Sequence, residues 1–352
     1  MALSDVRRRA TALPGLDPAG YQRHSLHGEA AQWPEKNCYI DLWIELVHAM
    51  GCDPHAMLGH TLPIDFEGDQ WTFFKPSHDQ LRRLYGIDVQ ELTIWRPLAD
   101  HALEHLSAGK LVSVEADAWW LPDTAGTDYR QKHTKTTIVL ADIDLDAQRL
   151  VYFHNAGCFA LGGENFVETF RLGREDDPDY LPLFAEVVRS DRRVVRPLAE
   201  LRAAARADLA EQFARRPASN PVRRFAEAFE RDLPLMRERG LAHYHAWAFA
   251  GTRQLGAAAE LTARWLQWMG DTPSPAEQRA IAAFDRLSAG AKTFILKGAR
   301  VVSSTKPADL GALFGGMVDA WDEGMGALAE QLAARAGGPG SEMQRDDLAD
   351  GA

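Results

Sequence analysis

The clearest hydrophobic pattern in the chain lies between residues 38 and 50. Apolar side chains recur there at the spacing of one helix face, and they are Tyr39, Leu42, Trp43, Leu46, Val47 and Met50. Asn37 is a good N-cap residue, and Gly51 can adopt the left-handed conformation that ends many helices. The pattern therefore predicts a helix that begins at Cys38 and packs one face against a core.

Strand and helix signals alternate from this helix to about residue 190. Residues 111–122 predict a strand, and residues 134–144 and 149–155 predict a hairpin with a polar turn. Helical patterns occupy two further stretches, 77–85 and 96–109. An α+β domain is the fold that such a mixture indicates.

The second half has a different pattern, with long helical segments and no strand-like alternation after about residue 200. Proline-containing loops at 214–224 and 270–278 separate the helices. We therefore predict four parts, which are an N-terminal arm (1–30), an α+β domain (31–190), an all-helical domain (191–336) and a disordered tail (337–352).

The composition places this chain among proteins of the cytoplasm. It has 352 residues, 46% of them hydrophobic, which is enough for two cores, and no apolar run approaches the roughly 18 residues that span a bilayer. The basic start lacks the apolar segment of a secretory signal. Three cysteines, Cys38, Cys52 and Cys158, are too few for a disulfide framework, which favours reduced thiols.

The net charge of −11 argues against a general nucleic-acid binder. Residues 192–239 nevertheless carry 12 Arg against 7 Asp or Glu, a local excess of 5 positive charges. This excess predicts either a solvated helix face or a docking surface for an acidic partner, formed by Arg215, Arg216, Arg223 and Arg224.

Cys38 is the candidate nucleophile. In the first turn of a helix, unpaired N–H groups and the positive end of the dipole favour thiolate over thiol. The same amides can hold an oxyanion, and Gln32, six residues earlier, is a candidate to complete that site. Cys38 as a buried structural residue is the alternative, and it is our interpretation for Cys52 and Cys158.

A thiolate nucleophile needs a base, and the base needs an orienting acceptor. His133 precedes the first strand of the predicted hairpin and Asn155 ends the second, so cysteine, histidine and asparagine occur in the order of a papain-like triad. His154 could replace either partner, and His133 could instead be a surface residue. The sequence shows no zinc-type spacing, so we expect no metal and no bound cofactor.

The segments VEADAWWLPDTAGTDYRQKHTKTTIVLADID (114–144) and LVYFHN (150–155), after a helix led by Cys38, resemble the N-terminal domain of butirosin-pathway acyltransferases. The resemblance implies a papain-like fold for residues 31–190 and substrate contacts from Asp117, Trp119 and His154. It also implies aminoacyl transfer from an acyl carrier protein to a small amine. The partner would carry the phosphopantetheine.

A closer likeness joins WPEKNCYIDLWIEL, DFEGDQWTFFKP, YGIDVQEL and YFHNAG to a proteobacterial family with members near carrier-protein aminoacylation genes. One departure from the first resemblance is that the histidine is expected where this chain has Thr136 and Thr137. The predicted function is a Cys38-dependent acyltransferase. A papain-like hydrolase (peptidase or thioesterase) and a non-catalytic scaffold that binds a carrier protein are the alternatives.

Overall fold

In the computed structural model of the protein, the structure is described for residues 8–174, 183–304 and 309–336. The tail predicted at 337–352 lies outside them. Within these ranges, no helix is long and apolar enough to cross a membrane.

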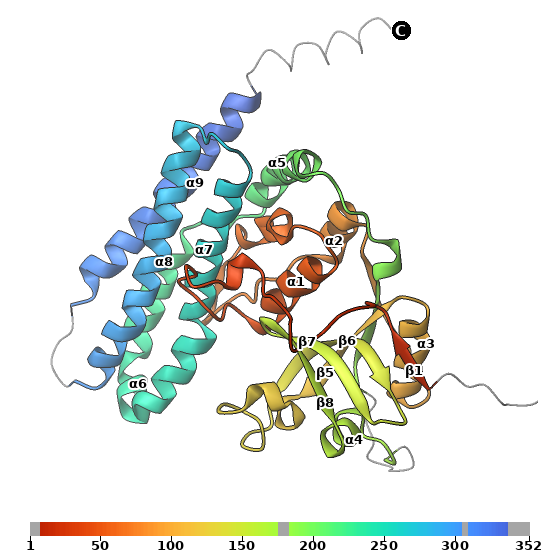
Figure 1. Ribbon diagram of the computed structural model, residues 1–352. Coiled ribbons are helices and arrows are strands. Elements are labelled where there is room, and N and C mark those ends of the chain that lie inside the picture. The colour runs from red at the N-terminus through yellow and green to blue at the C-terminus, as the bar shows by residue number, and fades with distance from the viewer. Residues whose placement is uncertain (1–7, 175–182, 305–308, 337–352) are drawn as a thin grey trace, which may run out of the picture. The chain divides into compact units, whose positions relative to one another are not determined.

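The chain folds into two compact units (Figure 1). The first contains the chain up to residue 57 and then residues 76–198, and the second contains residues 58–75 and the chain from residue 199 onward. The predicted α+β composition of the first half and helical composition of the second are confirmed. The sequence did not predict that the short segment 58–75 would join the helical unit.

The core of the first unit is an antiparallel sheet of seven strands. These are β1 (Arg9–Thr11), β4 (Asp88–Glu91), β5 (Leu111–Asp117), β6 (Lys135–Asp144), β7 (Arg149–His154), β8 (Gly157–Gly162) and β9 (Ala185–Arg189). The order is β4-β9-β5-β6-β7-β8, and β1 pairs with β6 beside this path. Consecutive residues of β6 and β7 are buried, so both faces of the sheet centre are covered.

Helix α1 (Cys38–Ala49) packs against β6 and β7 (Figure 1). Its ends are those that the sequence predicts. The Asn37 side chain accepts a hydrogen bond from the backbone N–H of Ile40, 2.9 Å away. At the other end Gly51 is left-handed with φ 75°, and its N–H donates to the carbonyl of His48. The next N–H, of Cys52, donates to Val47, which completes a Schellman motif.

Among the described residues, three further α-helices belong to this unit, namely α2 (His78–Tyr85), α3 (Leu98–Ser107) and α4 (Glu164–Phe170). The predicted strand 111–122 is shorter than expected because β5 ends at Asp117. The Asp117 side chain accepts from the N–H of Trp119 and starts a 3-10 turn, and Pro122 opens a second turn. The predicted arm also differs, since residues 9–11 form an edge strand and Leu26 is buried.

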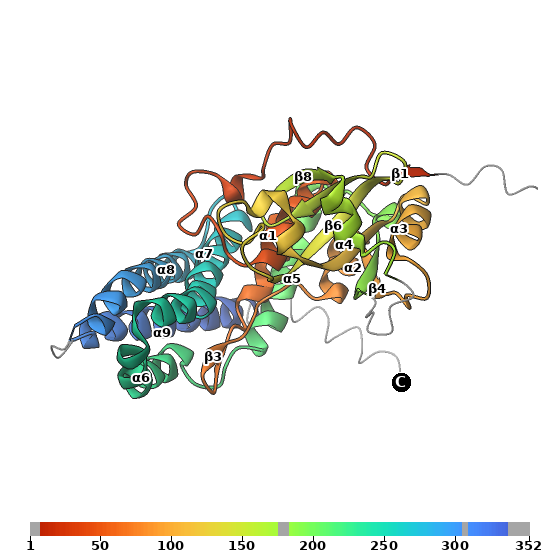
Figure 2. The ribbon, with the colours of Figure 1, turned by 90° about the horizontal axis from the view of Figure 1, so that it is seen from below.

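The second unit consists of five helices and one hairpin among the described residues. They are α5 (Leu198–Ala214), α6 (Pro221–Ala250), α7 (Thr252–Trp268), α8 (Pro275–Val302), α9 (Gly311–Ala336), β2 (Phe66–Glu67) and β3 (Gln70–Trp71). Helices α7, α8 and α9 lie side by side (Figures 1 and 2). Helix α6 is interrupted at Gly240, whose φ of 79° and ψ of −175° are not helical.

Aromatic side chains form the centre of this helical core. The rings of Phe225 and Trp247 stack with centroids 5.5 Å apart, and Phe229 and Phe294 meet edge to face at 4.9 Å. Trp265 is fully buried in this core, whereas Trp247 and Trp268 are partly buried.

Gly298 of α8 allows α6 and α8 to approach closely. The Tyr244 hydroxyl donates to the carbonyl oxygens of Phe294 and Ile295, and a Cβ at position 298 would overlap that hydroxyl. We expect Gly298→Ala to lower the free energy of unfolding by about 1–3 kcal/mol, as overpacking does. Denaturant midpoints would measure the change.

Gly326→Ala is the matched control, because Gly326 is exposed on α9 and a Cβ there meets nothing within 4 Å. Alanine is the better helix former, so this variant should gain up to about 1 kcal/mol. If both variants shifted stability in the same direction, close packing at Gly298 would not be the cause.

Candidate functional site

Cys38 is the first residue of α1 and is half-buried. The other two cysteines, Cys52 and Cys158, are buried. Burial raises the pKa of Cys52, and burial with a contribution from the Asp17 carboxylate raises the pKa of Cys158 to about 12. Of the three thiols, Cys38 is therefore the one whose position suits a nucleophile.

Two carboxylates are buried along α1. Asp41 and Glu45 are 2% and 0% exposed and lie one helical turn apart. His27 bridges them, because its Nδ1 contacts a Glu45 oxygen and its Nε2 lies 2.9 Å from Oδ1 of Asp41. The backbone N–H of Lys36 donates to Asp41 at 2.9 Å, and the Tyr21 hydroxyl donates to Glu45 at 2.7 Å. We call these five residues the anchor network.

The charges of the anchor network balance when His27 is protonated. Burial opposes protonation, but the hydrogen bonds to Asp41 and Glu45 outweigh it and raise the pKa of His27 above its ordinary 6.5. Burial would also raise the pKa of Glu45, but the bond and charge of His27 hold it below 4.5. The network therefore fixes residues 21–36 against the helix that carries Cys38.

The anchor network also shows which face of the sheet carries α1. Tyr21, bonded to Glu45 of α1, packs on the ring of Phe153 with centroids 5.6 Å apart. Directly paired residues on neighbouring strands point to the same face. The register extends this face, here named the α1 face, from Phe153 to Val139, Ser113 and Glu186.

His133 pairs with Asp117 rather than with Asn155. Its Nδ1 lies 2.6 Å from Oδ2 of Asp117, and its ring stacks on Trp119 with centroids 4.5 Å apart. Asp117 follows Ser113 by four residues on β5, so it belongs to the α1 face. A histidine held through Nδ1 can exchange a proton at Nε2. The Asp117–His133 pair thus has the arrangement of a general base, and the His133 side chain is 69% exposed.

A cavity of about 220 Å³ adjoins this pair. Its lining includes Asp117, Trp120, His133, Thr169 and Arg171. The buried hydroxyl of Thr169 has no hydrogen-bond partner among the described residues. The cavity therefore offers acidic, basic and hydroxyl groups beside an accessible imidazole.

Asn155 occupies the turn between β7 and β8 with φ 45°. The β6–β7 pairing ends at Val139 and Phe153, so neither Asn155 nor His133 belongs to the paired part of these strands. No hydrogen bond joins Asn155 to His133 in the described part of the chain, because His133 precedes β6 and turns toward Asp117 instead.

His154 lies on the opposite face from α1, since it is adjacent to Phe153 on β7. It is 1% exposed, with Nδ1 2.6 Å from Asp123 and Nε2 2.8 Å from the Thr136 hydroxyl. The sheet separates it from Cys38. His154 is therefore a structural residue of the opposite layer and does not fit the alternative role of base.

Sequence reasoning missed a second histidine–carboxylate pair on the α1 face. Nε2 of His78 lies 3.7 Å from Oε1 of Glu186, which is 9% exposed. Burial and the Glu186 carboxylate raise the pKa of Tyr39 to about 12, so Glu186 lies near the first turn of α1. His78 and Glu186 are far apart in sequence, so no local sequence pattern predicts that they meet.

Gln32, the predicted oxyanion residue, is half-buried in the segment before α1.

The four arginines predicted to dock a partner differ in their surroundings. Arg224 donates to the Phe66 carbonyl at 2.6 Å and forms an ion pair with Asp65, which ties α6 to the β2–β3 hairpin. Three of the four are exposed, namely Arg215, Arg216 and Arg223. Only these three suit a docking surface.

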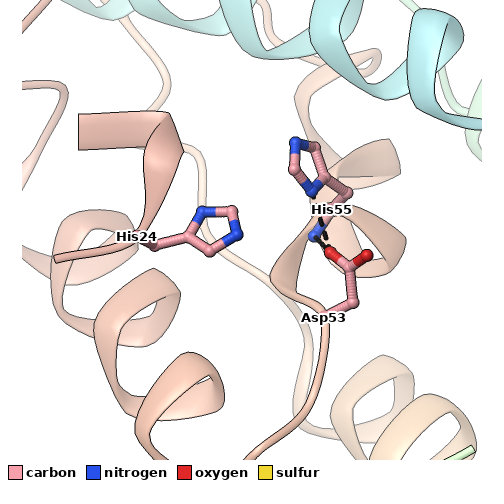
Figure 3. Close-up of side chains that lie close together, drawn as sticks. All are labelled: His24, Asp53 and His55. Atoms are coloured by element: carbon pink, nitrogen blue, oxygen red, sulfur yellow. Dashed lines mark hydrogen bonds and ion pairs between the residues drawn. The ribbon is translucent and has the colours of Figure 1, made fainter. Parts of the chain in front are cut away.

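One group of residues has the spacing of a metal site, although the sequence predicts none. His24, Asp53 and His55 each offer a ligand atom, and these atoms lie within 4.8 Å of one another (Figure 3). Within the described residues, this is the one group of at least three such side chains. Burial and the neighbouring His55 and His48 lower the pKa of His24 to about 4, so its imidazole is neutral at pH 7.

The anchor network predicts a pH-dependent stability difference between the wild type and His27→Gln. Because the pKa of folded His27 is raised, its contribution is complete below 6.5 and is lost as pH rises through the folded value. Because the pKa of Glu45 is lowered, its contribution is complete above 4.5 and is lost as pH falls through the folded value. The difference should be largest between these limits, at about 3–5 kcal/mol.

Thermal or denaturant unfolding between pH 4 and 9 would measure the difference. His245→Gln, at an exposed position of α6, should leave the pH profile of stability unchanged. A His27→Gln variant with wild-type stability at every pH would show that His27 does not neutralise the buried carboxylates.

Comparison with known families covers most of the chain. Residues 22–190 match the DUF1839 N-terminal domain, and residues 198–330 match the DUF1839 C-terminal domain. A comparison with curated proteins found no match. The first matched range ends at residue 190 and the second begins at residue 198, where the compact units also divide. The chain belongs to the two-domain DUF1839 family.

Proposed function

We propose that this protein is a cysteine-dependent acyltransferase with a papain-like first domain. It takes an acyl or aminoacyl group from a carrier-protein thioester and passes it to a small amine. The observation that supports this is the shared face of the sheet: α1, which begins at Cys38, and the Asp117–His133 pair both belong to the α1 face. The resemblance to butirosin-pathway acyltransferases supports the donor and acceptor classes.

The proposed chemistry has two steps. The Cys38 thiolate attacks the thioester carbonyl, the bond to the phosphopantetheine sulfur breaks, and that sulfur leaves as a thiol by taking a proton from the protonated His133 imidazole. The acceptor amine then attacks the acyl-enzyme, His133 takes the amine proton, and the Cys38 thiolate is released with formation of an amide. Asp117 orients the His133 ring through Nδ1. N–H groups at the start of α1 and the Gln32 amide would hold the oxyanion.

The exposed arginines of the helical unit, Arg215, Arg216 and Arg223, suit an acidic carrier protein. In this proposal the partner brings the phosphopantetheine arm, so the enzyme itself needs no bound cofactor for the transfer.

Intact mass after mixing with an acylated carrier protein tests the proposal. We expect one acyl adduct on the wild type and none on Cys38→Ala. We expect His133→Gln and Asp117→Asn to slow transfer to an added amine by about 10²–10⁴-fold, as loss of a general base does. His105→Gln on α3 is a matched control that should transfer at the wild-type rate.

Three other outcomes would each contradict one part of the proposal. Free acid in the presence of excess amine would make the protein a hydrolase. Binding of the carrier without any adduct would make it a scaffold. A loss of transfer in His78→Gln with normal transfer in His133→Gln would move the role of base to the His78–Glu186 pair.

A further inference from the structure

The two chain segments that flank α1 meet beside its C-terminal end. His24 precedes the 3-10 turn Ser25–His27, whereas Asp53 and His55 follow the helix. His24 lies between two other imidazoles, with ring centroids 5.1 Å from His48 of the last helical turn and 5.1 Å from His55. Figure 3 shows the His24 ring pointing toward the other two side chains.

Asp53 and His55 hold each other in place. Oδ1 of Asp53 accepts from the backbone N–H of His55 at 3.0 Å and lies 2.8 Å from its ring Nδ1. The rotamers of both side chains are thus set by the turn that contains them. This contact holds the His55 imidazole and the Asp53 carboxylate beside each other.

We propose that His24, Asp53 and His55 bind one divalent metal ion such as zinc. Two imidazoles and a carboxylate are a ligand set that such ions accept, with water filling the open position. A four-coordinate zinc holds neighbouring ligand atoms about 3.3 Å apart, so atoms now within 4.8 Å must close by about 1 Å or somewhat more. Side-chain rotation alone can supply a movement of that size.

The ion would stabilise the structure and would take no part in the acyl transfer. His48 and Cys38 are ten residues apart on α1, which separates them by about 15 Å along the axis. The ion would join the segment before α1 to the segment after it. It would also lie near the C-terminal, negative end of the helix dipole, which favours a cation.

Binding would change one contact of His24. Its Nδ1 accepts a hydrogen bond from the N–H of Leu26 at 3.2 Å, at the long end of the usual range. Because Nδ1 is the acceptor, the proton of the neutral ring is on Nε2. Coordination through Nε2 would move that proton to Nδ1 and break the bond to Leu26. The ion replaces a weak local cap with a link between distant segments.

Calorimetric titration of the metal-free full-length protein with zinc chloride tests the proposal. We expect one equivalent to bind and to raise the melting temperature. His24→Gln and His55→Gln should each weaken binding by at least about 100-fold. Asp53→Asn, which preserves shape, should weaken it as well, and circular dichroism would verify that each variant is folded. His105→Gln removes one imidazole of the i, i+4 pair with His101 on α3 and should bind as the wild type does.

The visible spectrum of the cobalt-substituted protein distinguishes an ion bound at this site from one bound by a cysteine thiolate. We expect a visible spectrum of nitrogen and oxygen ligands without thiolate charge-transfer bands. Thiolate bands that disappear in Cys38→Ala would place the ion at Cys38 and overturn the proposal. So would the absence of a stoichiometric ion in the wild type, or unchanged affinity in His24→Gln and His55→Gln. None of these results depends on acyl transfer.

Discussion

The burial of two carboxylates on α1 is the constraint on which the first unit depends. Asp41 and Glu45 cannot remain charged in the interior without positive partners, because an uncompensated buried charge destabilises a fold by several kcal/mol. The partners are His27 and Lys36, and both come from the segment before the helix. That segment must therefore lie along α1, although it has almost no regular structure of its own.

Several features follow from this placement. Lys36 is held by Asp41 immediately before Asn37, so the cap of α1 and the position of Cys38 are fixed together. His24 lies three residues before His27, and the same contacts bring it to the far end of the helix. The thiol at one end of α1 and the imidazole cluster at the other are thus positioned by one set of buried charges.

Side chains alternate between the two faces of the sheet along each strand, and this alternation decides on which face a histidine lies. His154 and Phe153 are neighbours in sequence, yet they point to opposite faces. Phe153 faces α1, whereas His154 bonds to Asp123 and Thr136 in the other layer. His133 lies outside the strands and reaches the α1 face through Asp117.

Local signals explain what could be predicted from the sequence. The start and end of α1 depend on Asn37 and Gly51, which act within a few residues, and β6 and β7 have strong apolar runs. The anchor network was not predicted because His27 meets partners 14 and 18 residues away. Composition and periodicity do not record such pairings.

The candidate site was predicted only in part for the same reason. Chain order and the predicted hairpin suggested Asn155 as the partner of His133. In the folded chain Asn155 lies in the turn after β7, and His133 pairs with Asp117 instead. The pairs His24–His55 and His78–Glu186 likewise join segments that only the folded chain brings together.

In our proposal Cys38 and the Asp117–His133 pair form one reactive site. The decisive measurement is the rate of Cys38 alkylation by iodoacetamide as a function of pH, followed by peptide mapping. A nearby protonated imidazole stabilises a thiolate, so the wild-type midpoint should lie below the ordinary value of about 8.5 and rise toward it in His133→Gln. The same midpoint in both proteins, near about 8.5, would contradict the claim.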